Sequence, residues 1–212
     1  FFSLFCHSIG GCMPTYEDLF GSEEEDDEDW LHPPTPLVPD LLVLRDFASP
    51  PEQAMLLQEI EAAALFSGST NQAVTYGSIP PWTDFIAQRV GPYLLPLDRQ
   101  PLFDQSITNH YDTGQGIKLH KDLPQFDEGI VGLSLCSSVV MDFVSDEGQH
   151  EAVLLRPGDV YVLRGRAQYQ WKHGIAERLA DTFEGVCIPR RPRISITLRR
   201  VLPHLVRVTN LN

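Results

Sequence analysis

Residues 106–122, SITNHYDTGQGIKLHKD, are the stretch around which the rest of the chain can be organised. Two pairs of polar residues stand at even spacing within it, Asn109 with Tyr111 and His120 with Asp122, and a glycine-rich turn separates them. Side chains two residues apart in a β-strand lie on the same face of the sheet. The stretch is therefore predicted to line a pocket with an amide, a phenol, an imidazole and a carboxylate.

A metal centre is the first function that this arrangement indicates. Two histidines and one carboxylate on one face of the ion are typical of non-haem Fe(II) sites, which keep positions open for substrate and oxygen. His120 and Asp122 would supply two of these three ligands. His173 is the best candidate for the third, because it follows the strand-like segment GDVYVLRGR and precedes a loop. Taken alone, a histidine such as His173 would more often be a partly buried structural residue.

A second pair with the same spacing, His110 and Asp112, competes for the metal. If Asn109 and Tyr111 face the pocket, His110 must face away from it. Asp112 also has a structural role open to it, since an aspartate readily begins a turn such as DTGQG by bonding the backbone. Spacing alone favours His120 with Asp122 but leaves the other pair open.

The segment RPRISITLRR, residues 191–200, carries a second set of alternating side chains. Two arginines on the inner face of a strand are costly unless an anion meets them. A dicarboxylate cosubstrate would fit, because the guanidinium fork binds a carboxylate through two parallel hydrogen bonds. An exposed strand with a basic face is the alternative. The residues predicted to share the polar face are Arg193, Ser195, Thr197 and Arg199.

From about residue 101 onward the sequence consists of short β-like runs separated by turn signals. Eight strands after two helices predict an α+β protein built on a double-stranded β-helix, or jelly roll, with the N-terminal helices packed on one sheet. The predicted strands are 105–111, 116–121, 130–136, 138–144, 151–155, 159–164, 168–173 and 193–201.

The part before these strands contains one further strand, at 41–47, and two helices. Ser49 followed by two prolines predicts the start of the first helix, which Ser67 and Gly68 would end. The second helix is predicted to begin near Pro81. Both carry an apolar stripe, which favours helices that cover a sheet.

Charge is unevenly distributed along the 212 residues. Residues 1–40 hold 10 of the 29 acidic residues and none of the 16 lysines and arginines, and they are interpreted as a disordered acidic arm with a proline-rich linker. Residues 41–212 would form a single domain. Within it, residues 156–207 hold 11 basic against 4 acidic residues, which favours a polyanionic partner.

The four cysteines show neither CxxC nor zinc-site spacing, which favours a reduced, intracellular compartment, the cytoplasm and/or the nucleus. The apolar opening FFSLFC is too short to span a bilayer, so no membrane association is expected. Met13 directly precedes the acidic segment and is expected to be the natural start.

Together the motifs resemble those of the AlkB-like Fe(II)/2-oxoglutarate dioxygenases. The resemblance covers roughly residues 40–202 and leaves the acidic arm outside. It favours His120 over His110. The matching residues, in the family's order, are Asn109-x-Tyr111, His120-x-Asp122, His173, and Arg193 with Arg199.

The resemblance implies a site with Fe(II), the cosubstrate 2-oxoglutarate and O2. His120, Asp122 and His173 would bind the iron. The reaction would decarboxylate 2-oxoglutarate and hydroxylate a substrate C–H bond, releasing formaldehyde where that carbon is an N-methyl group. Around the cosubstrate, Arg193 and Tyr111 would hold the distal carboxylate, Asn109 and Arg199 would lie at the metal-proximal end, and Ser195 stands where some members have Asn.

The substrate implied by the resemblance is an alkylated or modified nucleic-acid base, in RNA, tRNA or single-stranded DNA, bound by a monomer. Residues 67–80 would form a lid, and Tyr76 could stack on an extruded base. Tyr76 could equally be a packed tyrosine of a hairpin. The chain looks most similar to members that hydroxylate modified wobble uridine. The alternatives are an oxygenase acting on a protein side chain and a jelly-roll binding module without turnover.

Overall fold

The computed structural model describes residues 37–66, 68, 70–94 and 99–202. The predicted acidic arm therefore lies outside the described residues, except for its last four positions. Val38 is buried, and the Asp40 carboxylate accepts hydrogen bonds from the backbone and the side chain of Arg166. The packed domain thus begins a few residues before position 41.

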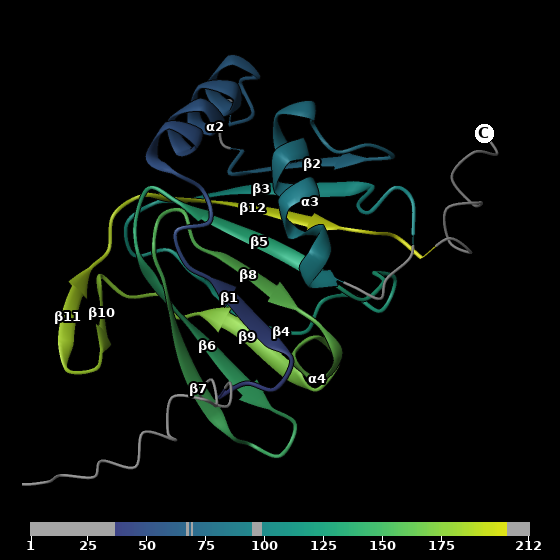
Figure 1. Ribbon diagram of the computed structural model, residues 1–212. Helices are drawn as coiled ribbons and strands as arrows, with labels where there is room; N and C mark the ends of the chain where they lie inside the picture. The colour runs from purple at the N-terminus through teal and green to yellow at the C-terminus, as the bar shows by residue number, and fades with distance from the viewer. Residues whose placement is uncertain (1–36, 67, 69, 95–98, 203–212) are drawn as a thin grey trace, which may run out of the picture. The chain divides into compact units, whose positions relative to one another are not determined.

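Antiparallel strands form two main sheets and one separate hairpin, as Figure 1 shows. In each main sheet the strand order departs from the chain order, so the chain crosses repeatedly between the sheets, and the predicted jelly roll is confirmed. The larger sheet has the order β1 (Leu41–Leu44), β8 (Val160–Leu163), β5 (Ile130–Leu135), β12 (Arg193–Arg199), β3 (Gln105–Tyr111) and β2 (Gln72–Tyr76). The smaller sheet has the order β4 (Ile117–His120), β9 (Trp171–Ile175), β6 (Val139–Ser145) and β7 (His150–Leu155).

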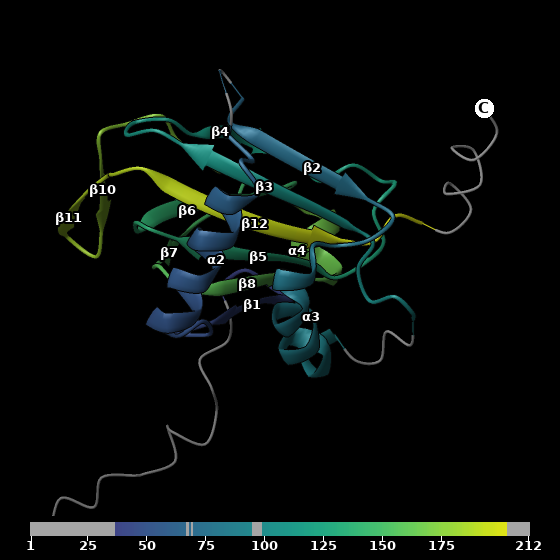
Figure 2. The same ribbon diagram turned by 90° about the horizontal axis from the view of Figure 1, so that it is seen from above.

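Two helices cover the outer face of the larger sheet (Figure 2). Helix α2 (Pro50–Ala62) begins where the sequence predicts, because the backbone and the hydroxyl of Ser49 both donate to the Glu52 carboxylate. The second predicted helix is a 3-10 turn η1 (Pro81–Thr83), the helix α3 (Asp84–Val90) and a further 3-10 turn η2 (Gly91–Leu94).

The buried apolar side chains divide into two clusters. One lies between the helices and the sheet, where Leu56 and Ile86 are completely buried. The other lies between the two sheets and includes Phe143 and Tyr161. Because the helices occupy only the outer face, the inner face of the larger sheet remains open to the smaller one. In the described part of the chain, no helix has the length and apolar character needed to cross a membrane.

One predicted strand is wrong. Residues 168–173 do not form a single strand, since helix α4 (Gly165–Tyr169) ends there and β9 starts at Trp171. The cause is a contact distant in sequence: the Gln168 side chain accepts from the Gly129 N–H and donates to the Asp127 carbonyl. Such a bond cannot be read from local periodicity.

Three strands of the structure are not expected from the sequence pattern. The edge strand β2 lies within the predicted lid and pairs with β3 over residues 72–76. Strands β10 (Ala180–Phe183) and β11 (Val186–Pro189) form the separate hairpin. Buried Asp181 holds this hairpin to the fold by ion pairs with Arg178 and Arg190 and by a hydrogen bond from the Val140 N–H.

Replacing Leu56 tests the packing of helix α2 on the sheet. Leu56→Ala leaves a cavity in the cluster beneath the helix and is expected to lower the free energy of unfolding by about 2–5 kcal/mol. Urea titration followed by circular dichroism measures the change. Gln58→Ala, at an exposed position of the same helix, should lower it by less than about 0.5 kcal/mol. Equal effects of the two substitutions would contradict this packing.

Candidate metal and cosubstrate site

The three predicted metal ligands come together between the two sheets. His120 ends β4, His173 lies in β9, and the two residues pair directly across these neighbouring strands. Their ring centroids are 4.5 Å apart. Asp122 follows two residues after His120, and its Oδ2 lies 3.6 Å from Nε2 of His173. The predicted pair, His120 with Asp122, and the predicted third ligand, His173, thus lie in one cluster.

The hydrogen bond of His120 fixes which of its nitrogens can bind a metal. Its Nδ1 lies 2.8 Å from the backbone carbonyl oxygen of Lys118. A carbonyl oxygen only accepts hydrogen bonds, so Nδ1 carries the proton and the lone pair is on Nε2. Metal-ligating histidines are commonly oriented by such a bond from the second nitrogen.

Burial keeps His173 neutral. The side chain is 7% exposed. Desolvation by burial lowers the pKa of His173 to about 4, against an opposing attraction from Asp122. At neutral pH the imidazole is therefore uncharged, which is the form that coordinates a metal.

Asp122 is a buried carboxylate that is only half satisfied. Its Oδ1 lies 2.5 Å from an Nη2 of Arg199, while its Oδ2 has no hydrogen-bond partner among the described residues. A buried carboxylate oxygen without a partner is costly. The unpartnered oxygen faces His173, and a cation bound beside it would remove the cost. This donor set, two imidazoles and one carboxylate, fits an Fe(II) ion.

The three side chains are neighbours, but their spacing is wider than that of the ligands of one ion. Nowhere in the described residues do three His, Cys, Asp or Glu side chains stand close enough to enclose one. Donor atoms that share an ion at right angles, with bonds of about 2.1 Å, are about 3 Å apart. The separation of 3.6 Å between Asp122 and His173 is slightly larger. Binding would therefore require the side chains to move together by a few tenths of an ångström.

Arg193, the residue predicted to bind the distal carboxylate, lies on strand β12. The side chain is buried, and its Nε donates to the Ser134 hydroxyl at 3.0 Å. The guanidinium carbon lies 5.6 Å from the ring centroid of Tyr111. Its Nη2 has no partner among the described residues. A buried guanidinium with a free donor is suited to a carboxylate.

The remaining predicted cosubstrate residues share this face of the sheet. Ser195 of β12 pairs with Asn109 of β3, as Arg193 pairs with Tyr111. The Asn109 amide oxygen accepts a hydrogen bond from Gln72 at 2.7 Å. Arg199 lies at the other end of β12, against Asp122 and over the ring of Phe126. The predicted alternation of β12 is thus found in the structure.

His110 and Asp112, the competing pair, lie elsewhere. The imidazole of His110 contacts the ring of Phe66, with 5.5 Å between centroids, on the helix-covered side of the larger sheet. The backbone N–H of Asp112 donates to the side-chain oxygen of Gln115, in the turn that the sequence predicts. The structure therefore separates this pair from His173.

Two residues at the site were not found by sequence reasoning, Ser134 and Tyr161. Ser134 lies in the continuous apolar run of β5, and Tyr161 in that of β8. A continuous run gives no sign of which face points to a pocket. Their proximity to Arg193 follows from strand pairing, which no local pattern specifies.

The basic excess of the C-terminal third is mostly used inside the domain. Seven of the eleven basic residues donate to an acid, a carbonyl or a hydroxyl of the same domain. Part of the basic excess therefore serves contacts within the domain, while side chains such as that of Arg166, which is 58% exposed, remain at the surface. The seven residues are Arg164, Arg166, Arg178, Arg190, Arg193, Arg199 and Arg200.

Tyr76 lies on the edge strand β2 with its side chain 64% exposed. It pairs with Gln105 of β3, and Gln105 pairs in turn with Arg199. Residues that pair directly across strands share a face of the sheet. Tyr76 is therefore exposed on the same face as the cosubstrate residues, not packed inside a hairpin.

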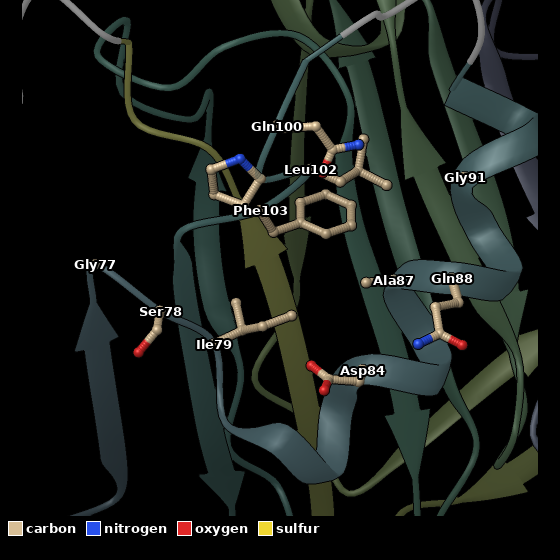
Figure 3. Close-up of a pocket in the computed structure, with 11 residues that line it drawn as sticks. Gly77, Ser78, Ile79, Asp84, Ala87, Gln88, Gly91, Gln100, Leu102 and Phe103 are labelled. Atoms are coloured by element: carbon tan, nitrogen blue, oxygen red, sulfur yellow. The ribbon is translucent and has the colours of Figure 1, made fainter.

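A separate cavity of about 460 Å³ lies outside this site, between helix α3 and residues 100–103 (Figure 3). Its lining includes Ile79, Leu102 and Phe103, with Asp84 and Gln88 from the helix. It contains no histidine and none of the predicted site residues.

Comparison with known proteins identifies the family. The model of the 2OG-Fe(II) oxygenase superfamily matches residues 69–199. The uncharacterized protein L905 of Acanthamoeba polyphaga mimivirus is 37% identical over 118 residues, which are 54% of this chain and 55% of that protein. The tRNA (carboxymethyluridine(34)-5-O)-methyltransferase ALKBH8 of Macaca fascicularis is 42% identical over 82 residues, 38% of this chain but only 12% of that protein.

The fold is shared with solved structures of low sequence identity. The structure of OsALKBH1 superposes with a TM-score of 0.56 at 15% identity, over 76% of this chain and 98% of that one. The family model covers more than half of the chain and includes every predicted metal and cosubstrate residue. The protein therefore belongs to the 2OG-Fe(II) oxygenase superfamily.

Proposed function

We propose that this protein is an Fe(II)- and 2-oxoglutarate-dependent dioxygenase that hydroxylates or demethylates a modified nucleic-acid base. The observation that carries the proposal is the facing pair of unsatisfied groups between the sheets. The Asp122 Oδ2 beside His173 and the Arg193 Nη2 have no hydrogen-bond partner among the described residues. An iron ion and a dicarboxylate together would satisfy both.

The residues at the two ends of the site would have different roles. His120, Asp122 and His173 would hold Fe(II). Arg193 would hold the distal carboxylate of 2-oxoglutarate with help from Tyr111, while Asn109, Ser195 and Arg199 would line its metal-proximal end. When bound, Fe(II) and 2-oxoglutarate activate O2, so that one oxygen atom enters a substrate C–H bond and the other leaves in succinate as CO2 is released.

Two observations support a nucleic-acid base as the substrate. A relative that matches part of this chain is named as a tRNA methyltransferase. Tyr76, exposed on the site's face of the edge strand, offers a ring on which a base could stack. The proposal does not rest on an open basic surface. We further propose that the protein acts as a monomer, in the cytoplasm and/or the nucleus.

The first rival function keeps the chemistry but acts on a methylated or hydroxylated protein side chain. The second is a jelly-roll binding module without turnover. The clustering of both the metal and the cosubstrate residues favours an enzyme over the binding module.

Substitution of the two histidines distinguishes the two possible metal pairs. His120→Ala removes a proposed ligand and should abolish succinate release from 2-oxoglutarate. His110→Ala removes only a contact with Phe66 and should leave most of this turnover. Mass spectrometry of succinate measures both variants. Turnover that survives in the first variant and disappears in the second would show that the metal is held by the other pair.

Substitution of Arg193 tests the anion-binding end. Arg193→Ala leaves the distal carboxylate without its cation, and the loss of one member of a buried charge pair costs about 2–5 kcal/mol. The KM for 2-oxoglutarate should therefore rise by one to several orders of magnitude, as a cosubstrate titration would measure. Arg156→Ala, at an exposed arginine outside the site, should leave the KM unchanged. An unchanged KM in the first variant would refute this role.

A substrate screen tests the choice of nucleic acid over protein. The enzyme should release succinate with modified nucleosides placed in RNA or single-stranded DNA, and the oligonucleotide should lose or gain mass accordingly. Tyr76→Ala should raise the KM for the oligonucleotide about tenfold or more, since a base stacked on an aromatic ring contributes about 1–3 kcal/mol. Tyr76→Phe keeps the ring and should behave like the wild type. Turnover on methyl-lysine peptides but on no oligonucleotide would support the rival substrate.

A further inference from the structure

Tyr161 is a buried polar residue at the site to which the proposed function gives no role. It lies in β8 and is 6% exposed. Its neighbours Val160 and Val162 belong to the cluster beneath the helices, whereas Tyr161 belongs to the cluster between the sheets. The phenol therefore points toward the metal and cosubstrate residues.

A glycine in the neighbouring strand leaves the space that the Tyr161 side chain occupies. Tyr161 pairs with Gly132 of β5, which pairs in turn with Thr197 of β12, so the three residues form a row across the sheet. A Cβ atom at position 132 would overlap the ring and the hydroxyl of Tyr161. Because glycine lacks that atom, the ring lies across β5, and its hydroxyl reaches a hydrogen bond with Thr197.

In this position the Tyr161 phenol is near Arg193. The Arg193 side chain bonds Ser134, which occupies the next row of the same face. Tyr111 and Tyr161 are the two groups whose charge would act most strongly on the Arg193 guanidinium. The guanidinium carbon lies 5.6 Å from the ring centroid of Tyr111, and the Nη2 of Arg193 is the donor without a described partner.

The hydroxyl of Tyr161 is available as a proton donor. Burial, followed by the nearby charge of Asp122, raises the pKa of Tyr161 above its ordinary value. The group is therefore neutral at physiological pH. A neutral phenol can donate one hydrogen bond to an anion, and such bonds to charged groups are stronger than those between neutral groups.

We propose that Tyr161 is a positioning residue for the cosubstrate, whose hydroxyl donates to the distal carboxylate held by Arg193 and whose ring forms the floor of the pocket. This inference rests on the proposed function. The hydroxyl turns from Thr197 to the carboxylate when 2-oxoglutarate binds. Gly132 is then required, because a side chain at this position would prevent the Tyr161 phenol from lying across β5.

The competing explanation is that Tyr161 serves only the packing of the sheets and the bond to Thr197. The two explanations predict that the substitution weakens the binding of different ligands. A donor to the distal carboxylate affects only 2-oxo acids that have one. A packing role affects all 2-oxo acids alike, including 2-oxopentanoate, which has the same chain length but no distal carboxylate.

The test measures the binding of 2-oxoglutarate and 2-oxopentanoate to the Mn(II)-loaded full chain by calorimetry. Tyr161→Phe should raise the Kd for 2-oxoglutarate about tenfold or more, the effect of losing a hydrogen bond to a charged group. It should change the Kd for 2-oxopentanoate by less than about twofold. Tyr169→Phe removes an exposed hydroxyl on α4 and should change neither value.

Thr197→Val provides the second variant, because it removes the present partner of the hydroxyl and leaves the phenol in place. It should weaken 2-oxoglutarate binding much less than Tyr161→Phe does. Equal weakening by the two variants, equal weakening of both 2-oxo acids, or no weakening at all would each overturn the inference. A wild-type chain that fails to bind 2-oxoglutarate would instead refute the proposed function, so the two failures are distinct.

Discussion

The buried ion pair between Asp122 and Arg199 is the contact on which the site depends. It joins the end of β4 in one sheet to β12 in the other, with its two oppositely charged atoms 2.5 Å apart. Burying charges is costly, and one pair does not satisfy every atom. Asp122 Oδ2 and Arg193 Nη2 remain without partners among the described residues. These unsatisfied atoms mark where a cation and an anion would be stabilised, which is why a dioxygenase site is the simplest account of them.

The jelly roll provides this arrangement by dividing the faces of its larger sheet. The outer face is covered by α2 and α3, whose apolar stripes bury Leu56 and Ile86. The inner face is left for polar side chains, and β12 carries them at every second position from Arg193 to Arg199. The smaller sheet then brings His120 and His173 opposite, because β4 and β9 are neighbours although they are far apart in the sequence. Alternation along strands and crossing between sheets thus build the site together.

Much of this could be predicted from local patterns. The alternation in residues 105–111 predicted both ends of β3, that in residues 193–201 predicted the start of β12 at Arg193 but placed its end two residues too far, and the capping by Ser49 predicted the start of α2. What could not be predicted depends on partners distant in the sequence. Gln168 bonds residues about forty positions away, and Arg166 bonds Asp40 through its backbone and its side chain. For the same reason Tyr161 became visible as a site residue only once its pairing with Gly132 was known.

The central claim is that one ion and one 2-oxo acid bind together between the sheets. Anaerobic titration of the metal-free chain with Fe(II) and 2-oxoglutarate tests it most directly, because chelation of the iron by the 2-oxo acid produces a charge-transfer band in the visible spectrum. The account predicts a band that requires both components and saturates at one equivalent of each. The absence of a band when both are present, together with no succinate release on admission of O2, would contradict it.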